Sequence, residues 1–377
     1  MKVYFDHAAT SPIHPDVAEL MYQVIKEDFG NPSSSHSFGR KAKSHLELSR
    51  KKIAQLLNVS PSEIVFTSGG TEADNLILRS GVIDLGIKTI ITSPIEHHAV
   101  LHTVEDLNQK YGTQVLYVNL LENGHVDLKH LEELLQNHSN VLVSLMHANN
   151  EIGNIIDLKL IGDLCLKYNA LFHSDTVQTM GNYALDFNYE TSGINIDFAV
   201  GAAHKFNGPK GVGFMFYKKK NKLKPCITGG GQERELRAGT ENIYGIAAMA
   251  KALEICYAEM EKKQAHLKEL KSYFIQRIEN ELPEIKFNGD YKGNSSYTVL
   301  SLALPPRVVS EMLLFNFDLH GIAISGGSAC SSGSNKGSHV IRAIKQNLDC
   351  APIRFSFGKT STKEEVDFAI NFMKTLF

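Results

Sequence analysis

The sequence predicts an α/β fold in which a mostly parallel, seven-stranded sheet forms a large domain and a smaller α+β domain follows it. Seven short apolar runs lie between about residues 60 and 217, and helical stretches separate them. Such near-continuous apolar runs are typical of strands buried on both faces, and strand–helix alternation favours a parallel sheet. The alternation stops after about residue 250, and 377 residues exceed what one hydrophobic core usually supports.

The strands of the large domain are expected, in order, at residues 63–68, 88–93, 114–120, 140–147, 170–175, 197–202 and 211–218. Segments such as DLKHLEELLQN and DLKLIGDLCLKYN between them have helical periodicity, and Cys165 lies in the apolar stripe of the second. We expect this domain to span residues 15–250.

The smaller domain is expected to comprise residues 1–14 and 251–377. Its predicted elements, in order, are a helix at 259–282, a strand at 297–304, a helix at about 306–317, a strand at 321–325, a Gly/Ser-rich loop at 326–338, a strand at 353–358 and a final helix.

Composition excludes several classes of function. The formal net charge is −2, whereas nucleic-acid and anionic-membrane binding usually require a basic surface. No apolar run has the length of a signal peptide or a transmembrane helix. The five cysteines are sparse and none has CxxC spacing, so we expect neither disulfides nor structural zinc, and a cytoplasmic location.

A glycine-rich turn in FTSGGTEADN (66–75) is the first candidate site. Gly70 and Thr71 stand where a predicted strand meets a helix, and a helix N-terminus there could bind an anion such as phosphate. The motif matches neither nucleotide-binding glycine pattern. On this motif alone, an ordinary strand–helix turn capped by Thr71 is favoured over phosphate binding.

Two ionisable residues follow predicted strands of the same sheet. Asp175 in SDTVQ stands where a parallel strand delivers side chains to the active crevice, although it could merely cap a helix. Lys205 in AAHKFNGPKG follows a later strand. Such a lysine is usually exposed, but one desolvated beside an anionic site can form a Schiff base.

His97 and Cys330 complete the candidates. His97, in EHHAV, could stack on a planar cofactor, bind a metal or fill the core; with His98 and His102 it lacks HExxH spacing, so no metal is expected. Cys330 lies in SGGSACSSGS (325–334), unlike a core cysteine, and could act as a nucleophile or be incidental.

Together these motifs resemble the cysteine desulfurases of the NifS/IscS type, within the class V aminotransferase family. The resemblance covers nearly the whole chain, in matching order. Besides the motifs above it includes YFDHAAT (4–10), GNPSSSH (30–36), HANNEIG (147–153), GGGQERELRAGTEN (229–242) and IRFSFG (353–358). It implies the fold of pyridoxal-phosphate (PLP) dependent transferases of fold type I.

The resemblance also implies roles for individual residues. Lys205 would carry PLP, Asp175 would pair with the pyridine nitrogen and Gln178 would bind the phenolic oxygen. His97 would stack on the ring and assist proton transfer as a catalytic residue. Gly70, Thr71 and His204 would bind the phosphate of PLP, and Thr240 would reach the phosphate of the neighbouring subunit. Asn150 would contact the cofactor or the substrate, and Arg354 and Asn31 would bind the substrate.

The implied reaction converts L-cysteine to L-alanine and leaves the sulfur on Cys330 as a persulfide. A homodimer and a sulfur-acceptor protein, for iron–sulfur assembly or tRNA thiolation, are the implied partners. A selenocysteine lyase or another class V aminotransferase-type enzyme is the alternative. A non-catalytic scaffold is disfavoured because Lys205, Asp175 and Cys330 are all present.

One position departs from the family pattern. Ala202 stands where members often have a serine whose hydroxyl contacts the phosphate. Because one neutral hydrogen bond contributes about 0.5–1.5 kcal/mol, we expect cofactor binding to weaken modestly and to survive.

Overall fold

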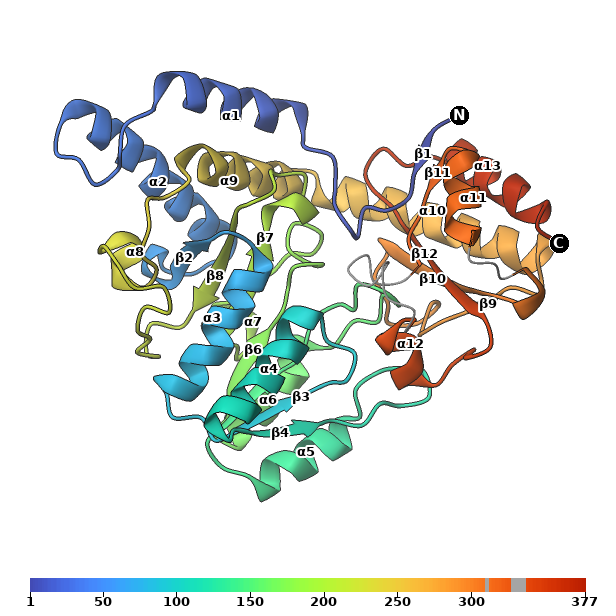
Figure 1. Cartoon of the computed structure of the whole chain (residues 1–377), viewed down its shortest axis with the longest axis horizontal. Helices are drawn as coiled ribbons and strands as arrows, with labels where there is room; N and C mark the ends of the chain where they lie inside the picture. The colour runs from blue at the N-terminus through green and yellow to red at the C-terminus, as the bar shows by residue number, and fades with distance from the viewer. Residues whose placement is uncertain (309–311, 327–336) are drawn as a thin grey trace.

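A seven-stranded sheet forms the centre of the larger part of the molecule (Figure 1). The computed structural model describes residues 1–308, 312–326 and 337–377. The strand order is β2-β8-β7-β6-β5-β3-β4; β8 runs antiparallel to both its neighbours and the other pairs are parallel. The predicted α/β class with a mostly parallel seven-stranded sheet is therefore confirmed.

Each of the seven predicted runs contains one strand of this sheet. The strands are β2 (Ile64–Thr67), β3 (Thr89–Thr92), β4 (Gln114–Tyr117), β5 (Val141–Ser144), β6 (Leu171–Ser174), β7 (Phe198–Ala202) and β8 (Gly213–Tyr217). All but β4 and the first residue of β6 are buried throughout, because helices cover both faces. β4 lies at the sheet edge, where its residues are partly exposed.

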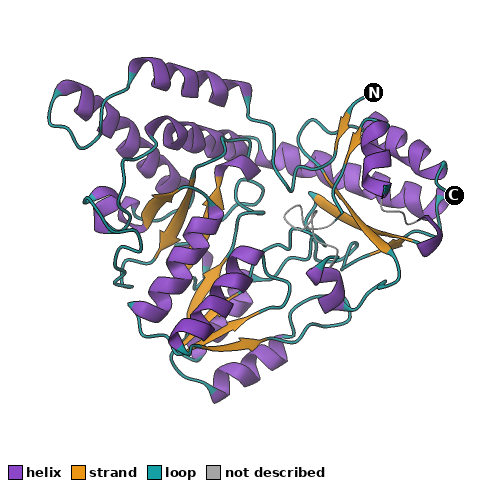
Figure 2. Cartoon of the chain, viewed as in Figure 1, coloured by secondary structure: helices purple, strands orange, loops and turns teal. Residues whose placement is uncertain are grey.

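Helices cover the sheet on both faces (Figure 2). One apolar cluster joins the sheet to α3 (Gly70–Ile83) and α4 (His98–Tyr111). The other joins it to α2 (Ser37–Leu56), α5 (Leu128–Asn137), α6 (Leu158–Lys167) and α9 (Ile243–Ala258), and α1 (Pro15–Glu27) packs on α9. Cys165 is fully buried in this second cluster, as its place in the helical stripe predicts. Two short helices, α7 (Tyr189–Ser192) and α8 (Gln232–Glu235), lie in the loops.

Local signals explain several helix ends. Asp127 and Asp157 precede α5 and α6, and each carboxylate accepts hydrogen bonds from two backbone N–H groups of the first turn. Such caps satisfy donors that the helix itself leaves unpaired. Gly112 ends α4 with a left-handed φ of 65°, a conformation that glycine adopts without steric cost.

A second core lies in the C-terminal part of the chain and includes the N-terminal strand. It contains α10 (Met260–Glu281), α13 (Lys363–Lys374) and a sheet of order β12-β10-β9, formed by Ala351–Ser356, Val299–Leu304 and Lys286–Phe287. The N-terminal β1 (Val3–Tyr4) pairs in parallel with β11 (Ile322–Ala323). Val3 and Phe5 pack in this second core, whereas the backbone of Ser11 and His14 hydrogen-bonds to His204 and Asn207 of the larger part.

Two segments of the C-terminal part differ from the elements and packing that the sequence predicts. The helix expected from about residue 306 begins at Leu313 as α11 (Leu313–Leu319), and residues 306–308 form a 3₁₀ turn. Pro305 and Pro306 supply no N–H for a helical ladder there. The short α12 (His339–Ile344) packs on Ile95 and Ile152 of the larger part instead of joining the second core. Within the described ranges, no helix has the length and apolarity needed to cross a membrane.

Candidate active site

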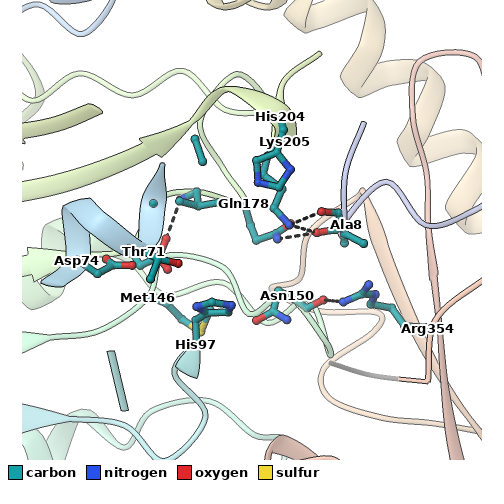
Figure 3. Close-up of a pocket in the computed structure, with 15 residues that line it drawn as sticks. Ala8, Thr71, Asp74, His97, Met146, Asn150, Gln178, His204, Lys205 and Arg354 are labelled. Atoms are coloured by element: carbon teal, nitrogen blue, oxygen red, sulfur yellow. Dashed lines mark hydrogen bonds between the residues drawn. The ribbon is translucent and has the colours of Figure 1, made fainter. Parts of the chain in front are cut away.

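A cavity of about 240 Å³ opens where the parallel strands of the large sheet end (Figure 3). Loops that follow β2, β3, β5, β6 and β7 line it, together with the N-terminal segment and β12. The lining residues are Ala8, Ala9, Gly70, Thr71, Asp74, His97, Met146, Asn150, Asp175, Val177, Gln178, Ala202, His204, Lys205 and Arg354. Residues far apart in the sequence thus meet at the carboxyl edge of the sheet, where ligands of open α/β folds bind.

Lys205 enters the cavity from the turn that follows β7. Its Nζ donates hydrogen bonds to the backbone oxygens of Ala8, at 2.5 Å, and Ala9, at 2.8 Å (Figure 3). The N-terminal segment therefore crosses the sheet edge and holds the amine over the cavity. A lysine amine in such a partly buried site is suited to covalent chemistry once deprotonated.

Asp175 directly follows β6 and is 6% exposed. One carboxylate oxygen accepts a hydrogen bond from the Val177 backbone N–H at 2.9 Å, so the local turn fixes its orientation. Burial raises the pKa of this carboxyl, while the neighbouring His97 and Lys205 act in the opposite direction. The arrangement provides a buried anionic partner for a cationic group in the cavity.

His97 caps the N-terminus of α4. Its Nδ1 accepts a hydrogen bond from the backbone N–H of Ala99 at 3.1 Å, so a neutral ring carries its proton on Nε2. Burial lowers the pKa of His97, although Asp175 opposes that effect. The structure places the ring in the cavity lining, as the stacking role requires, and holds it by the helix cap.

Gly70, Thr71 and His204 lie at one end of the cavity, beside the N-terminus of α3. A Cβ added to Gly70 would lie 2.9 Å from Val177 Cγ2, so a larger residue here would require the Val177 side chain to shift. The helix begins at Gly70, and Thr71 is not its cap. Burial and the nearby Lys205 and Lys210 lower the pKa of His204 to about 4, which keeps this ring neutral near pH 7. The first N–H groups of α3 and a neutral imidazole can together bind an anion.

Arg354 lies at the opposite end of the cavity, on β12. It is 1% exposed; Nη1 donates to the Asn150 backbone oxygen and Nη2 to the Asp6 carboxylate, both at 2.8 Å. Figure 3 shows Arg354 reaching toward Asn150. A guanidinium held in this way can present its remaining donors to a carboxylate. Gln178 contacts the N-terminal segment, since its Nε2 donates to the Ala8 oxygen at 3.1 Å.

Three predicted residues are not brought together with this group. Asn31 is exposed in the loop between α1 and α2, where its side chain accepts a hydrogen bond from the Ser33 N–H. Thr240 is also exposed and lines a separate hollow with residues such as Ser68 and Gly211. Cys330 lies outside the described residues.

Asp6, the backbone oxygens of Ala8 and Ala9, and Asp74 are site features that sequence reasoning missed. Asp6, Ala8 and Ala9 belong to the motif YFDHAAT. The motif resemblance therefore pointed to this segment but did not indicate which of its atoms contact the site. Asp74 is 2% exposed at the cavity wall, with Oδ1 3.4 Å from His173 Nε2. Burial and the nearby Asp175 raise the pKa of Asp74 well above its usual range, so a second negative charge beside Asp175 is disfavoured.

Comparison with known proteins relates this arrangement to one family. Residues 3–368 match the family model of class-V aminotransferases. The chain is 39% identical to cysteine desulfurase IscS of Dictyoglomus turgidum, covering 100% of this chain and 94% of that protein. It is 40% identical to putative cysteine desulfurase IscS 1 of Bacillus subtilis, covering 98% and 96% of the two chains.

Solved structures agree with the sequence relatives. A NifS-like protein superposes with a TM-score of 0.91 at 36% identity, covering 100% of this chain and 99% of that one. SspA in complex with cysteine superposes with a TM-score of 0.81 at 29% identity, covering 96% and 100%. The family match spans nearly the entire chain, the relatives align over more than nine-tenths of their length, and most of the candidate residues line one cavity. This chain belongs to the class-V aminotransferase family, among relatives named as cysteine desulfurases.

Proposed function

We propose that this protein is a PLP-dependent cysteine desulfurase. The observation that carries the proposal is the meeting of Lys205, Asp175 and His97 around one cavity at the carboxyl edge of the sheet. A reactive amine, a buried carboxylate and an aromatic ring are the three groups that a pyridine aldehyde cofactor requires. The family of the chain and its relatives named as cysteine desulfurases support the same conclusion.

The residues present fit PLP. Lys205 supplies the amine, and Asp175 would pair with the pyridine nitrogen in a site that burial keeps of low dielectric. Gly70, Thr71 and His204 would bind the phosphate beside the N-terminus of α3; a Cβ at Gly70 would fill part of the space there. His97 would cover the ring, and Gln178 would hydrogen-bond the phenolic oxygen.

When bound, PLP supplies an electron sink that stabilises negative charge at the substrate α-carbon. Arg354 and Asn150 hold the substrate carboxylate and so orient the α-proton. Lys205 then accepts that proton and returns it during the reaction. Asp175 would keep the pyridine nitrogen protonated, and the N-terminal segment holds Lys205 through the Ala8 and Ala9 oxygens.

Cys330 would act as the sulfur acceptor. Its thiolate attacks the sulfur of L-cysteine, the substrate carbon–sulfur bond breaks, and a sulfur–sulfur bond forms. L-cysteine and the Cys330 thiol therefore yield L-alanine and a Cys330 persulfide, with the thiol protons ending on the alanine methyl group and the persulfide. No other oxidant or reductant is needed.

The wider assignment follows from the same proposal. We infer a cytoplasmic homodimer, in which the exposed Thr240 reaches the phosphate of the neighbouring subunit. A second hollow, lined by Thr10, Lys210 and residues of the phosphate end, opens the site at that side. The persulfide would pass to an acceptor protein for iron–sulfur cluster assembly or tRNA thiolation. Binding to nucleic acid or membrane is not part of the proposal.

The experiment compares the purified holoenzyme with its Cys330→Ser variant, supplied with L-cysteine and a reducing thiol. We expect the parent enzyme to form alanine and sulfide in equal amounts, and the variant to keep the bound cofactor but form neither. Cys226→Ser is the matched control, because Cys226 is an exposed cysteine away from the cavity. Alanine formation at the parent rate by Cys330→Ser would contradict the persulfide mechanism.

A further inference from the structure

Both ends of the segment that contains Cys330 are joined to residues of the candidate active site. Residues 327–336 lie outside the description, but Ser325 and Ser338 on either side are placed. On the N-terminal side, Ser325 pairs with Arg354 through two backbone hydrogen bonds, Arg354 N to Ser325 O at 2.7 Å and Ser325 N to Arg354 O at 3.3 Å. The first end is therefore fixed to the backbone of the arginine that lines the cavity.

The second end is fixed to the turn that carries Asn150. The Ser338 hydroxyl donates to Glu151 Oε2 at 2.5 Å and accepts from Ile341 N at 3.1 Å, so it caps α12 at the same time. Both side chains are buried, with Glu151 1% exposed and Ser338 5% exposed. A buried hydrogen bond to a carboxyl group is a strong restraint, because either partner left alone would be unsatisfied.

Arg354 and Glu151 are themselves connected. Arg354 Nη1 donates to the backbone oxygen of Asn150, the residue before Glu151, at 2.8 Å. The Asn149 side chain stiffens the turn by accepting from the N–H groups of Glu151 and Ile152, at 2.8 and 3.0 Å. Ser325, Arg354, Asn150, Glu151 and Ser338 thus form a continuous chain of contacts from one end of the segment to the other.

The packing of α12 reinforces this connection. Its apolar side, Val340, Ile341 and Ile344, packs on Ile95 and Ile152, which flank the turns carrying His97 and Asn150. His339 Nε2 also donates to the backbone oxygen of Glu96, the residue before His97, at 2.9 Å. Figure 1 places α12 between the two parts of the molecule. The helix that follows the segment is therefore attached to the cavity wall on two sides.

We propose that Glu151 and Ser338 are positioning residues that fix where the Cys330 segment ends relative to the substrate-carboxylate residues Asn150 and Arg354. This inference rests on the proposed function, because it assigns them to the sulfur-transfer step. Neither Glu151 nor Ser338 is among the residues that line the cavity. Its loss should slow the attack of Cys330 on the substrate sulfur while the steps that need only the cavity continue.

The test separates these two kinds of step. Exchange of the L-cysteine α-proton in deuterium oxide, followed by mass spectrometry, reports the cavity and Lys205. Persulfide on Cys330, measured by alkylation and mass spectrometry, reports sulfur transfer. The holoenzyme is compared with Ser338→Ala, Glu151→Leu and Glu151→Gln. Glutamine keeps a side-chain oxygen in the place of Glu151 Oε2, so it can still accept the hydrogen bond from the Ser338 hydroxyl.

We expect Ser338→Ala and Glu151→Leu to slow persulfide formation about 10- to 100-fold, the scale on which small misplacement reduces rates, with α-proton exchange at the parent rate. Glu151→Gln should retain most of the transfer rate. Thr362→Ala is the matched control, since Thr362 caps α13 by the same hydroxyl chemistry away from the cavity. It should alter neither step.

Several outcomes would overturn the inference. Equal slowing of exchange and transfer would assign the pair a purely structural role, as would Thr362→Ala behaving like Ser338→Ala. Unchanged transfer in both Ser338→Ala and Glu151→Leu would show that the connection does not position Cys330. A failure of the proposed function is distinguishable, because the parent enzyme would then show no exchange or no persulfide on Cys330.

Discussion

The two ends of the cavity are constructed differently. At one end, Asp175, Lys205 and Gly70 come from the loops that follow buried strands of a single sheet, so each is fixed by the strand before it. At the other end, Arg354 lies on β12 in the C-terminal part and Asn150 lies in a turn after β5, and Arg354 donates to both the Asn150 oxygen and the Asp6 carboxylate. The first end rests on the sheet and on the N-terminal segment, whose Ala8 and Ala9 oxygens accept from Lys205, whereas the second also needs β12 to be in place.

This difference separates two tasks. Charge stabilisation and proton transfer require groups that hold one geometry, and the sheet edge supplies it. Substrate binding and sulfur transfer require residues from both the large sheet and the C-terminal part to lie together, and the contacts around Arg354 connect the two. We therefore expect substitutions at the sheet edge to act mainly on kcat, substitution of Arg354 itself mainly on KM, and substitution of Glu151 or Ser338 on the sulfur-transfer step.

The largest effect is expected from Asp175→Asn. The neutral amide cannot stabilise a protonated pyridine nitrogen, so kcat for alanine formation should fall on the order of 10²- to 10³-fold, as for other losses of preorganised electrostatic stabilisation. The cofactor should remain bound through Lys205. Steady-state kinetics with Asp127→Asn as control checks this, because Asp127 caps a helix outside the cavity and asparagine also caps. An unchanged kcat would contradict the role of Asp175.

Arg354→Lys tests the end of the cavity that is expected to bind the substrate carboxylate. An ammonium cannot reproduce the guanidinium contacts with Asp6, Asn150 and a substrate carboxylate. Charge-assisted hydrogen bonds contribute about 1.5–3 kcal/mol each, so KM for L-cysteine should rise about 10- to 150-fold. The exposed Arg307, changed to lysine, should leave KM as it is. A loss confined to kcat would remove the distinction between the two ends.

The pH dependence of kcat/KM tests the protonation state of His97. Because burial lowers the pKa of His97 below its ordinary value of 6.5, the ring stays neutral down to that pH and becomes charged only below it. The part of kcat/KM that depends on a neutral His97 should therefore be present above pH 6.5 and be lost as the pH falls further. The pH profiles of the parent and His97→Gln enzymes are compared. An acid limb centred above pH 6.5 that disappears in His97→Gln would contradict this assignment.

Ala202→Ser should have the smallest effect. Ala202 ends β7, is 2% exposed and lines the cavity beside Gly70. An added hydroxyl can give the phosphate one neutral hydrogen bond, worth about 0.5–1.5 kcal/mol, so PLP should bind about 2- to 10-fold more tightly. Titration of the apoenzyme with PLP measures it. Weaker binding would show that the cavity has no room for a hydroxyl at this position.

The sequence predicts the end of the cavity at the sheet edge better than it predicts the end around Arg354. Asp175, Lys205 and Gly70 could be placed near one another because parallel strands deliver their following residues to one edge. The contact of Lys205 with the Ala8 and Ala9 oxygens could not, because backbone acceptors carry no sequence signal. Nor could the Ser338–Glu151 hydrogen bond, which joins residues 187 positions apart. Asn31 and Thr240 came from motif resemblance alone, and this single chain keeps both outside the cavity.

The central claim is that Lys205 carries the cofactor. The direct measurement is borohydride reduction of the PLP-loaded enzyme, followed by proteolysis and mass spectrometry of the peptides. We expect a reduced pyridoxal-phosphate adduct on the peptide containing Lys205, and neither adduct nor visible absorption in Lys205→Ala. An adduct on another cavity-side lysine, such as Lys210 or Lys263, with Lys205 unmodified would contradict it.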